Sequence, residues 1–151
     1  MNRIEEAERA FAADKPEHFT NYTHCEECAE HDQTLRGADI YRIGLDELGN
    51  PGWDPLCFSS SEGKKYYIPA LIRLSIETIN DEFYFGQLLF HLEGDGEDNK
   101  FFLSCTKEQR LLLASFIDHM IAEYPGQIGN HGYTDEAFRV RQIWSETQRL
   151  A

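Results

Sequence analysis

The feature that most constrains how this chain folds is a long apolar stripe in its last third. Apolar side chains recur there at the spacing of one helix face, and they are Leu112, Leu113, Phe116, Ile117, Met120, Ile121 and Tyr124. Thr106 and Gln109 have the spacing of a capping box, which marks a helix start, and Pro125-Gly126 ends the pattern. Because such an apolar face must be covered, we expect this helix to be the central element of the core.

Helices are predicted along most of the remaining chain. Their expected bounds follow from apolar periodicity and capping residues, and they are 3–13, 23 to about 37, 40–48, 61–79 and 134 to about 148. Ser60 and Thr134 are the expected caps of the last two helices. In the last helix we expect three apolar anchors, Phe138, Ile143 and Trp144.

Three segments are less regular. Residues 83–92 suit either a strand or a buried helix, and the spacing of their leucines favours the helix. Residues 101–103 are expected to be short and extended. Pro69 lies inside the 61–79 helix and has no backbone N–H, so we expect a kink or a break there. The sequence therefore predicts one mainly all-α domain over residues 1–151, an irregular multi-helix arrangement with at most a minor extended segment.

The charge of the chain limits its partners. It carries 27 acidic against 14 basic residues, a formal charge of -13, and such a surface repels nucleic acid and anionic membranes. A protein partner or a homo-oligomer remains open. No apolar segment resembles a signal peptide or approaches a membrane span, and four cysteines are too few for a disulfide framework. We therefore expect a cytoplasmic protein with reduced thiols.

The chemically richest segment is residues 23–32, Thr-His-Cys-Glu-Glu-Cys-Ala-Glu-His-Asp. Thr23 and Glu26 form a second capping box, which would make His24 the first helical residue and place Cys25 in the first turn. A helix advances about 100° per residue, so about a third of its circumference would carry all four thiol and imidazole side chains, which are His24, Cys25, Cys28 and His31.

These four side chains are candidate zinc ligands, since zinc is bound in proteins by cysteine sulfur and histidine nitrogen. The side chains of one straight helix diverge, so a closed four-ligand site would need the helix start to unwind or another segment to contribute. The sequence thus predicts a zinc site formed by two or three of these residues together with a ligand from elsewhere.

Two other interpretations remain open. In the first, the motif is a redox pair, because a thiol at a helix N-terminus is stabilised as a thiolate. Against it, Glu26 and Glu27 are expected to raise thiol pKa values, and the chain lacks the strand–helix–strand pattern that carries such motifs. In the second, Cys25 and Cys28 are simply the buried stripe of this helix, together with Leu35.

Other chemical groups are expected to have structural roles. Residues 95–99 are acidic but lack the glycine and glutamate that a calcium loop requires. Cys57 and Cys105 are isolated in sequence and expected to be buried as small hydrophobic residues. His91 lies in an apolar run, where a hydrogen-bonded core histidine is the more common arrangement.

Three segments together resemble a family of small bacterial proteins whose function is not assigned. These are His24-Cys25-Glu26-Glu27-Cys28, then Ser60-x-Glu62-Gly63-x-x-Tyr66-Tyr67-Ile68-Pro69-Ala70, then Thr106-Lys-Glu-Gln109 before a leucine-rich helix. The resemblance covers roughly residues 20–125, with one departure at Gly63-Lys64, where the family pattern has a small residue followed by an aromatic one. It implies a bacterial, cytoplasmic, helical protein and carries no activity.

These observations predict a non-enzymatic binding or interaction module with a structural or regulatory zinc at the Cys-His helix. The alternative is an enzyme, either thiol-redox or metal-dependent, that uses Cys25 and Cys28.

Overall fold

The computed structural model describes residues 2–94 and 99–145. Within these ranges all the regular secondary structure is helical and no strand is present, so the predicted all-α fold is confirmed. The longer helices are α1 (Arg3–Ala10), α2 (Glu26–Gly37), α4 (Ser61–Glu77), α5 (Phe85–Glu93), α7 (Lys107–Glu123) and α9 (Thr134–Ser145). The shorter ones are α3 (Leu45–Leu48), η1 (Pro51–Trp53), η2 (Pro55–Phe58), α6 (Lys100–Ser104) and α8 (Pro125–Asn130).

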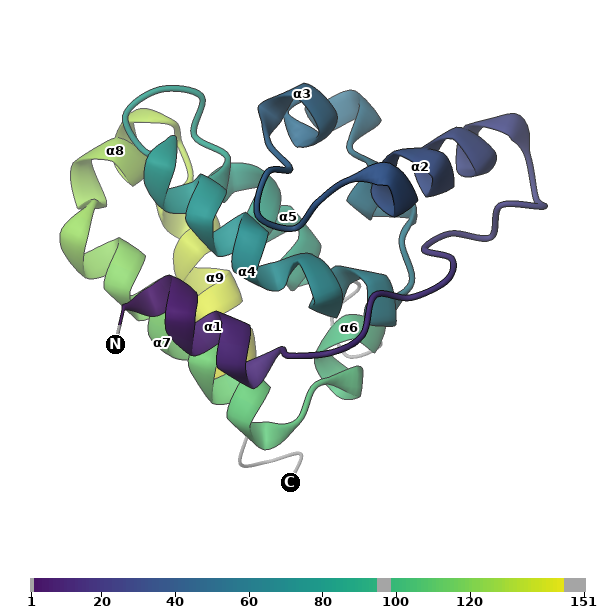
Figure 1. Ribbon diagram of the computed structural model, residues 1–151. Helices are drawn as coiled ribbons and strands as arrows, with labels where there is room; N and C mark the ends of the chain where they lie inside the picture. Colours follow the sequence, from purple (N-terminus) through teal and green to yellow (C-terminus); the bar gives the residue numbers. More distant parts are fainter. Residues whose placement is uncertain (1, 95–98, 146–151) are drawn as a thin grey trace.

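Helix α7 is a central core element, as its apolar stripe predicts. Both hydrogen bonds of its capping box are present, Gln109 N to Thr106 Oγ1 and Thr106 N to Gln109 Oε1. Phe116 and Met120 are fully buried. Helix α7 packs against α1, α8 and α9, while α5 packs against α4 and α9. These helices form the body of the molecule, and α2 lies toward one end of it (Figure 1).

Helix α4 confirms one expectation and corrects another. Ser60 caps it, since its Oγ accepts a hydrogen bond from Gly63 N. Of the kink or break predicted at Pro69, the break is absent, because the helix runs without interruption from Ser61 to Glu77. Pro69 and the residues on either side of it are buried, so packing holds the helix together despite the lost backbone donor.

Two predicted helices are shorter than the pattern indicates. Helix α1 ends at Ala10 instead of residue 13, and the Ala10 carbonyl accepts a hydrogen bond from the Gln109 side chain. Of the predicted 40–48 helix only α3 forms. The residues before it make a turn in which Arg42 N and Ile43 N both donate to Asp39 O, and the extended backbone of Gly44 separates that turn from α3.

The predicted extended segment at 101–103 is wrong, and these residues belong to α6. Asn99 caps this helix through a hydrogen bond from Phe102 N to its Oδ1, and Phe101 is buried. The helix predicted at 83–92 is confirmed as α5. Helix α8 was not predicted and begins directly at Pro125, a residue well suited to the first turn.

The last helix, α9, confirms Trp144 as a buried anchor and Ile143 as a partly buried one, but not Phe138. Thr134 is its first residue rather than its cap. Phe138 is exposed, and the buried positions are Ala137, Val140 and Trp144. Trp144 Nε1 donates to Leu92 O at 2.9 Å, which joins this helix to α5. The parts of the sequence predictions that concern residues 95–98 and 146–148 lie outside the described residues.

None of the described helices has both the length and the hydropathy needed to cross a membrane.

Candidate metal centre at the start of helix α2

Helix α2 begins two residues later than its capping box predicts. Cys25, not Thr23, is the N-cap, and its Sγ accepts from Cys28 N at 3.4 Å. Thr23 bonds instead to the side chain of Asn21, and His24 N donates to Asn21 O in a turn before the helix. His24 is therefore outside the helix, so helix geometry does not fix the position of its ring relative to the two thiols.

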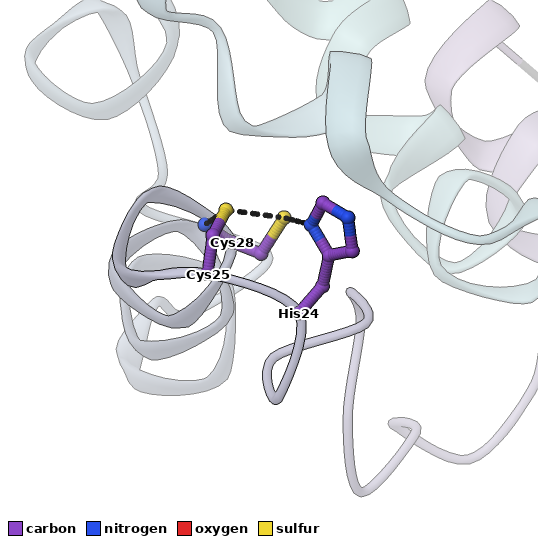
Figure 2. Close-up of side chains that lie close together, drawn as sticks. All are labelled: His24, Cys25 and Cys28. Carbon is purple, nitrogen blue, oxygen red and sulfur yellow. Dashed lines mark hydrogen bonds between the residues drawn. The ribbon is translucent and has the colours of Figure 1, made fainter.

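Three of the four predicted ligands come together (Figure 2). The sulfur atoms of Cys25 and Cys28 are 3.3 Å apart, and His24 Nδ1 lies 3.9 Å from Cys28 Sγ. All three ligand atoms lie within 4.8 Å of one another. In a tetrahedral zinc site, two sulfurs at about 2.3 Å from the ion are about 3.8 Å apart, and a sulfur and a nitrogen are about 3.5 Å apart. Small adjustments would therefore bring these atoms to zinc-binding distances.

His31, the fourth predicted ligand, is not part of this group. It is almost completely buried, and its ring packs against Trp53 and Phe58 with centroid distances of 4.6 Å to each. Its Nε2 lies 3.7 Å from Glu27 Oε1 and has no hydrogen-bond partner among the described residues. The structure thus offers three ligands for a metal ion, and a fourth would have to come from outside the group.

The two thiols are not packing residues, so that interpretation is wrong. Cys25 is exposed and Cys28 is half-buried. The buried face of α2 is formed by His31, Asp32 and Leu35. Both cysteines are therefore accessible to a metal ion or to a thiol reagent.

The two thiols have different acidities. The pKa of Cys25 is lowered to about 7, first by the hydrogen bond from Cys28 N–H, then by those with the His24 and Cys28 side chains. The pKa of Cys28 is raised, chiefly because its proton is held in the hydrogen bond to Cys25. The Glu27 charge also raises the pKa of Cys28, as expected from the sequence. The sequence-based expectation of a raised pKa is wrong for Cys25, whose pKa is lowered.

Asp32 anchors the segment that precedes the site, a role the sequence does not reveal. Its Oδ1 accepts from Phe19 N at 2.6 Å and from Thr20 N at 3.1 Å, and its Oδ2 contacts His18 Nδ1 at 2.7 Å. Thr20 Oγ1 in turn donates to Cys28 O. The loop that carries His24 is thereby fixed to the helix that carries the two thiols.

A second cluster was also missed, because His91 is far in sequence from Asp54 and Cys57. The ligand atoms of Asp54, Cys57 and His91 lie within 4.8 Å of one another. Cys57 is exposed, so the expectation that it is buried is wrong, whereas Cys105 is buried as expected. His91 is a core histidine, as predicted, but only Nε2 is hydrogen-bonded, and Nδ1 has no partner among the described residues.

Comparison of the chain with known protein families, curated proteins and solved structures finds no match. What the protein does is therefore argued from the geometry of its own residues.

Proposed function

We propose that this protein is a non-enzymatic binding protein in which His24, Cys25 and Cys28 hold a zinc ion that mediates contact with a protein partner. The observation that carries the proposal is the meeting of one imidazole and two thiols within 4.8 Å at an accessible helix start. The low pKa of Cys25 favours zinc, since zinc binds the thiolate. The reducing cytoplasm, where we place the protein, keeps both thiols available.

A regulatory or bridging zinc fits this site better than one that maintains the fold. Structural zinc sites are closed by four protein ligands, whereas this group supplies three. Helix α2 is already held by the buried Leu35 and by the hydrogen bonds of Asp32. We propose that the fourth position is filled by a side chain of the partner, which is either another protein or a second copy of this chain.

Zinc analysis of protein purified without a histidine tag tests the proposal. Wild type should retain zinc, and Cys28→Ser should lose one equivalent, as should His24→Ala. His119→Ala is the matched control, because it removes an imidazole outside the group and should keep the full zinc content. If Cys28→Ser and wild type contain equal amounts of zinc, no zinc is bound at this site.

The oligomeric state tests the bridging role. If a second copy supplies the fourth ligand, zinc should convert monomer to dimer in size-exclusion chromatography with light scattering, and Cys28→Ser should stay monomeric. If a different protein supplies it, the loaded protein stays monomeric, and a partner found by crosslinking should be lost in Cys28→Ser. A partner retained equally by Cys28→Ser would contradict the bridging role.

A thiol-redox enzyme is the second candidate, and the separation of the two sulfurs favours it. At 3.3 Å they are close enough to form a disulfide with little movement, and the more acidic thiol is the exposed one. Attack by the Cys25 thiolate on a substrate disulfide would give a mixed disulfide, which Cys28 would resolve as the substrate leaves as a dithiol. A zinc-free protein that cycles between dithiol and disulfide against glutathione would favour this function over zinc binding.

A further inference from the structure

The cluster of Asp54, Cys57 and His91 shares no residue with the α2 site and belongs to different elements. Asp54 caps η2, where its Oδ1 accepts from Leu56 N at 2.9 Å, and Cys57 lies in η2 itself. His91 comes from α5 and contacts Asp54 Oδ2 through Nε2 at 2.9 Å. The three donor groups are therefore positioned by two ordered helical segments.

Asp54 is a buried carboxylate that accepts hydrogen bonds on both oxygens, with Leu56 N as the donor to Oδ1. It is 2% exposed. Its Oδ2 accepts from Gln87 Nε2 at 2.9 Å and from Tyr84 OH at 3.3 Å, in addition to His91 Nε2. These partners fix the position of the carboxylate and of the imidazole beside it.

His91 retains an unused donor atom. The residue is 5% exposed, and Nδ1 has no hydrogen-bond partner among the described residues. A buried polar atom without a partner is destabilising, because it has lost its hydrogen bonds to water. The ring can carry its single proton on either nitrogen, so it is able to offer a lone pair to a metal ion.

The cluster opens into a cavity. Asp54, Cys57 and His91 all line a hollow of about 370 Å³, whose other walls include Phe83, Phe90, His131 and Tyr133. A metal ion at the cluster would thus have protein ligands on one side and accessible space on the other.

Cys57 does not behave as a nucleophile in this setting. Partial desolvation of the sulfur and the negative charge of Asp54 raise the pKa of its thiol to about 11, although the side chain is exposed, so it is protonated near neutral pH. This argues against a catalytic thiol activated by His91. A divalent cation reverses the effect, because it offsets the Asp54 charge and binds the sulfur as thiolate.

We propose that Asp54, Cys57 and His91 form a second transition-metal site, suited to zinc, with an open coordination position that faces the cavity. Carboxylate oxygen, thiolate sulfur and imidazole nitrogen are all zinc ligands, and three protein ligands with one open position characterise sites that bind water or a small ligand at the metal. On binding, the thiol proton leaves to solvent, and the imidazole keeps its proton on the nitrogen that does not bind the ion. This site is independent of the one at α2.

Cobalt(II) titration of the Cys25→Ser/Cys28→Ser double variant tests the proposal, because that background lacks the α2 site. We expect one cobalt ion per chain with thiolate-to-cobalt charge-transfer absorption. Adding Cys57→Ser should abolish that absorption and weaken binding at least tenfold; the residue is exposed, so the fold should be kept. His91→Asn, checked for helicity by circular dichroism, should weaken binding in the same way.

His131→Asn is the matched control, because this imidazole lines the same cavity outside the cluster. This variant should bind cobalt as tightly as the Cys25→Ser/Cys28→Ser background does. The proposal is overturned if the double variant binds no cobalt, if Cys57→Ser keeps the charge-transfer band, or if His131→Asn loses as much binding as Cys57→Ser. Loss of zinc in Cys28→Ser but not in Cys57→Ser of the wild-type background would refute this site alone and leave the α2 site standing.

Discussion

The acidity of Cys25 gives a prediction that tests the geometry of the α2 start directly. We expect iodoacetamide to alkylate Cys25 of the metal-free, reduced protein with a rate that rises through a midpoint near pH 7. The ordinary thiol pKa is 9.0, and that of Cys25 is lowered to about 7. At pH 7 about half of Cys25 is then thiolate, against about 1% for an ordinary thiol.

The size of the effect follows from two opposing terms. The gain in thiolate is about fifty-fold, but a thiolate loses nucleophilicity as its pKa falls, with a Brønsted coefficient of about 0.4–0.5. Over two pKa units that loss is about six- to ten-fold, so Cys25 should react about five to eight times faster than an ordinary thiol at pH 7. Desolvation of the sulfur raises the pKa of both Cys57 and the buried Cys105 to about 11, and these two should react far more slowly.

Peptide-resolved mass spectrometry of alkylated protein between pH 5 and 10 measures these rates. His24→Ala should move the Cys25 midpoint upward, since the hydrogen bond with His24 contributes to the low pKa. His119→Ala should leave it unchanged. A Cys25 midpoint near pH 9 in wild-type protein would refute the argument, because the N-cap hydrogen bond from Cys28 N could then not be present in solution.

Four further predictions concern the fold and its independence from the metal. Phe116→Ala removes a fully buried ring and should lower the free energy of unfolding by about 3–5 kcal/mol, or the melting temperature by roughly 6–20 °C. His119→Ala and the exposed Leu111→Ala should change the melting temperature little. If all three variants melt at the same temperature in differential scanning calorimetry, α7 is not a central core element. Asp32→Ala should cost about 1–3 kcal/mol for each backbone N–H of Phe19 and Thr20 left unpaired, measurable by urea unfolding. Burial alone would raise the pKa of Asp32, but His18 and the backbone donors hold that pKa below its usual value. The ionised Asp32 therefore stabilises the fold above about pH 4, and this stabilisation is lost as the pH falls through the lowered pKa. If wild type and Asp32→Asn lose stability in parallel on acidification, this prediction is wrong. Removal of zinc with a chelator should leave the helical circular-dichroism spectrum intact, whereas unfolding would make the metal structural.

The sequence predicts the helices well where one face is apolar over several turns. The stripe of α7 and its capping box identify both the helix and its burial, because periodicity and capping chemistry point to the same bounds. Phe138 shows the limit, since its neighbour Ala137 faces the core instead. Helix α9 has too few apolar residues for their spacing alone to show which face is buried.

For the candidate sites, too, the sequence identifies some residues correctly and misses others. The motif identifies His24, Cys25 and Cys28 because these residues are adjacent in sequence and remain together in space. It includes His31 wrongly, because the true helix start and the aromatic rings of Trp53 and Phe58 direct that side chain inward. The pair of Asp54 and His91 is separated by 37 positions, and only the tertiary fold brings the two side chains together.

X-ray absorption at the zinc edge tests the central claim most directly, with zinc-loaded Cys57→Ser protein so that the α2 site alone is observed. The account predicts two sulfur scatterers at about 2.3 Å and one imidazole nitrogen at about 2.0–2.1 Å, with a further light-atom ligand in the open position. His24→Ala should remove the imidazole signal. A shell made only of oxygen and nitrogen, or a zinc content that does not depend on Cys25 and Cys28, would contradict the account.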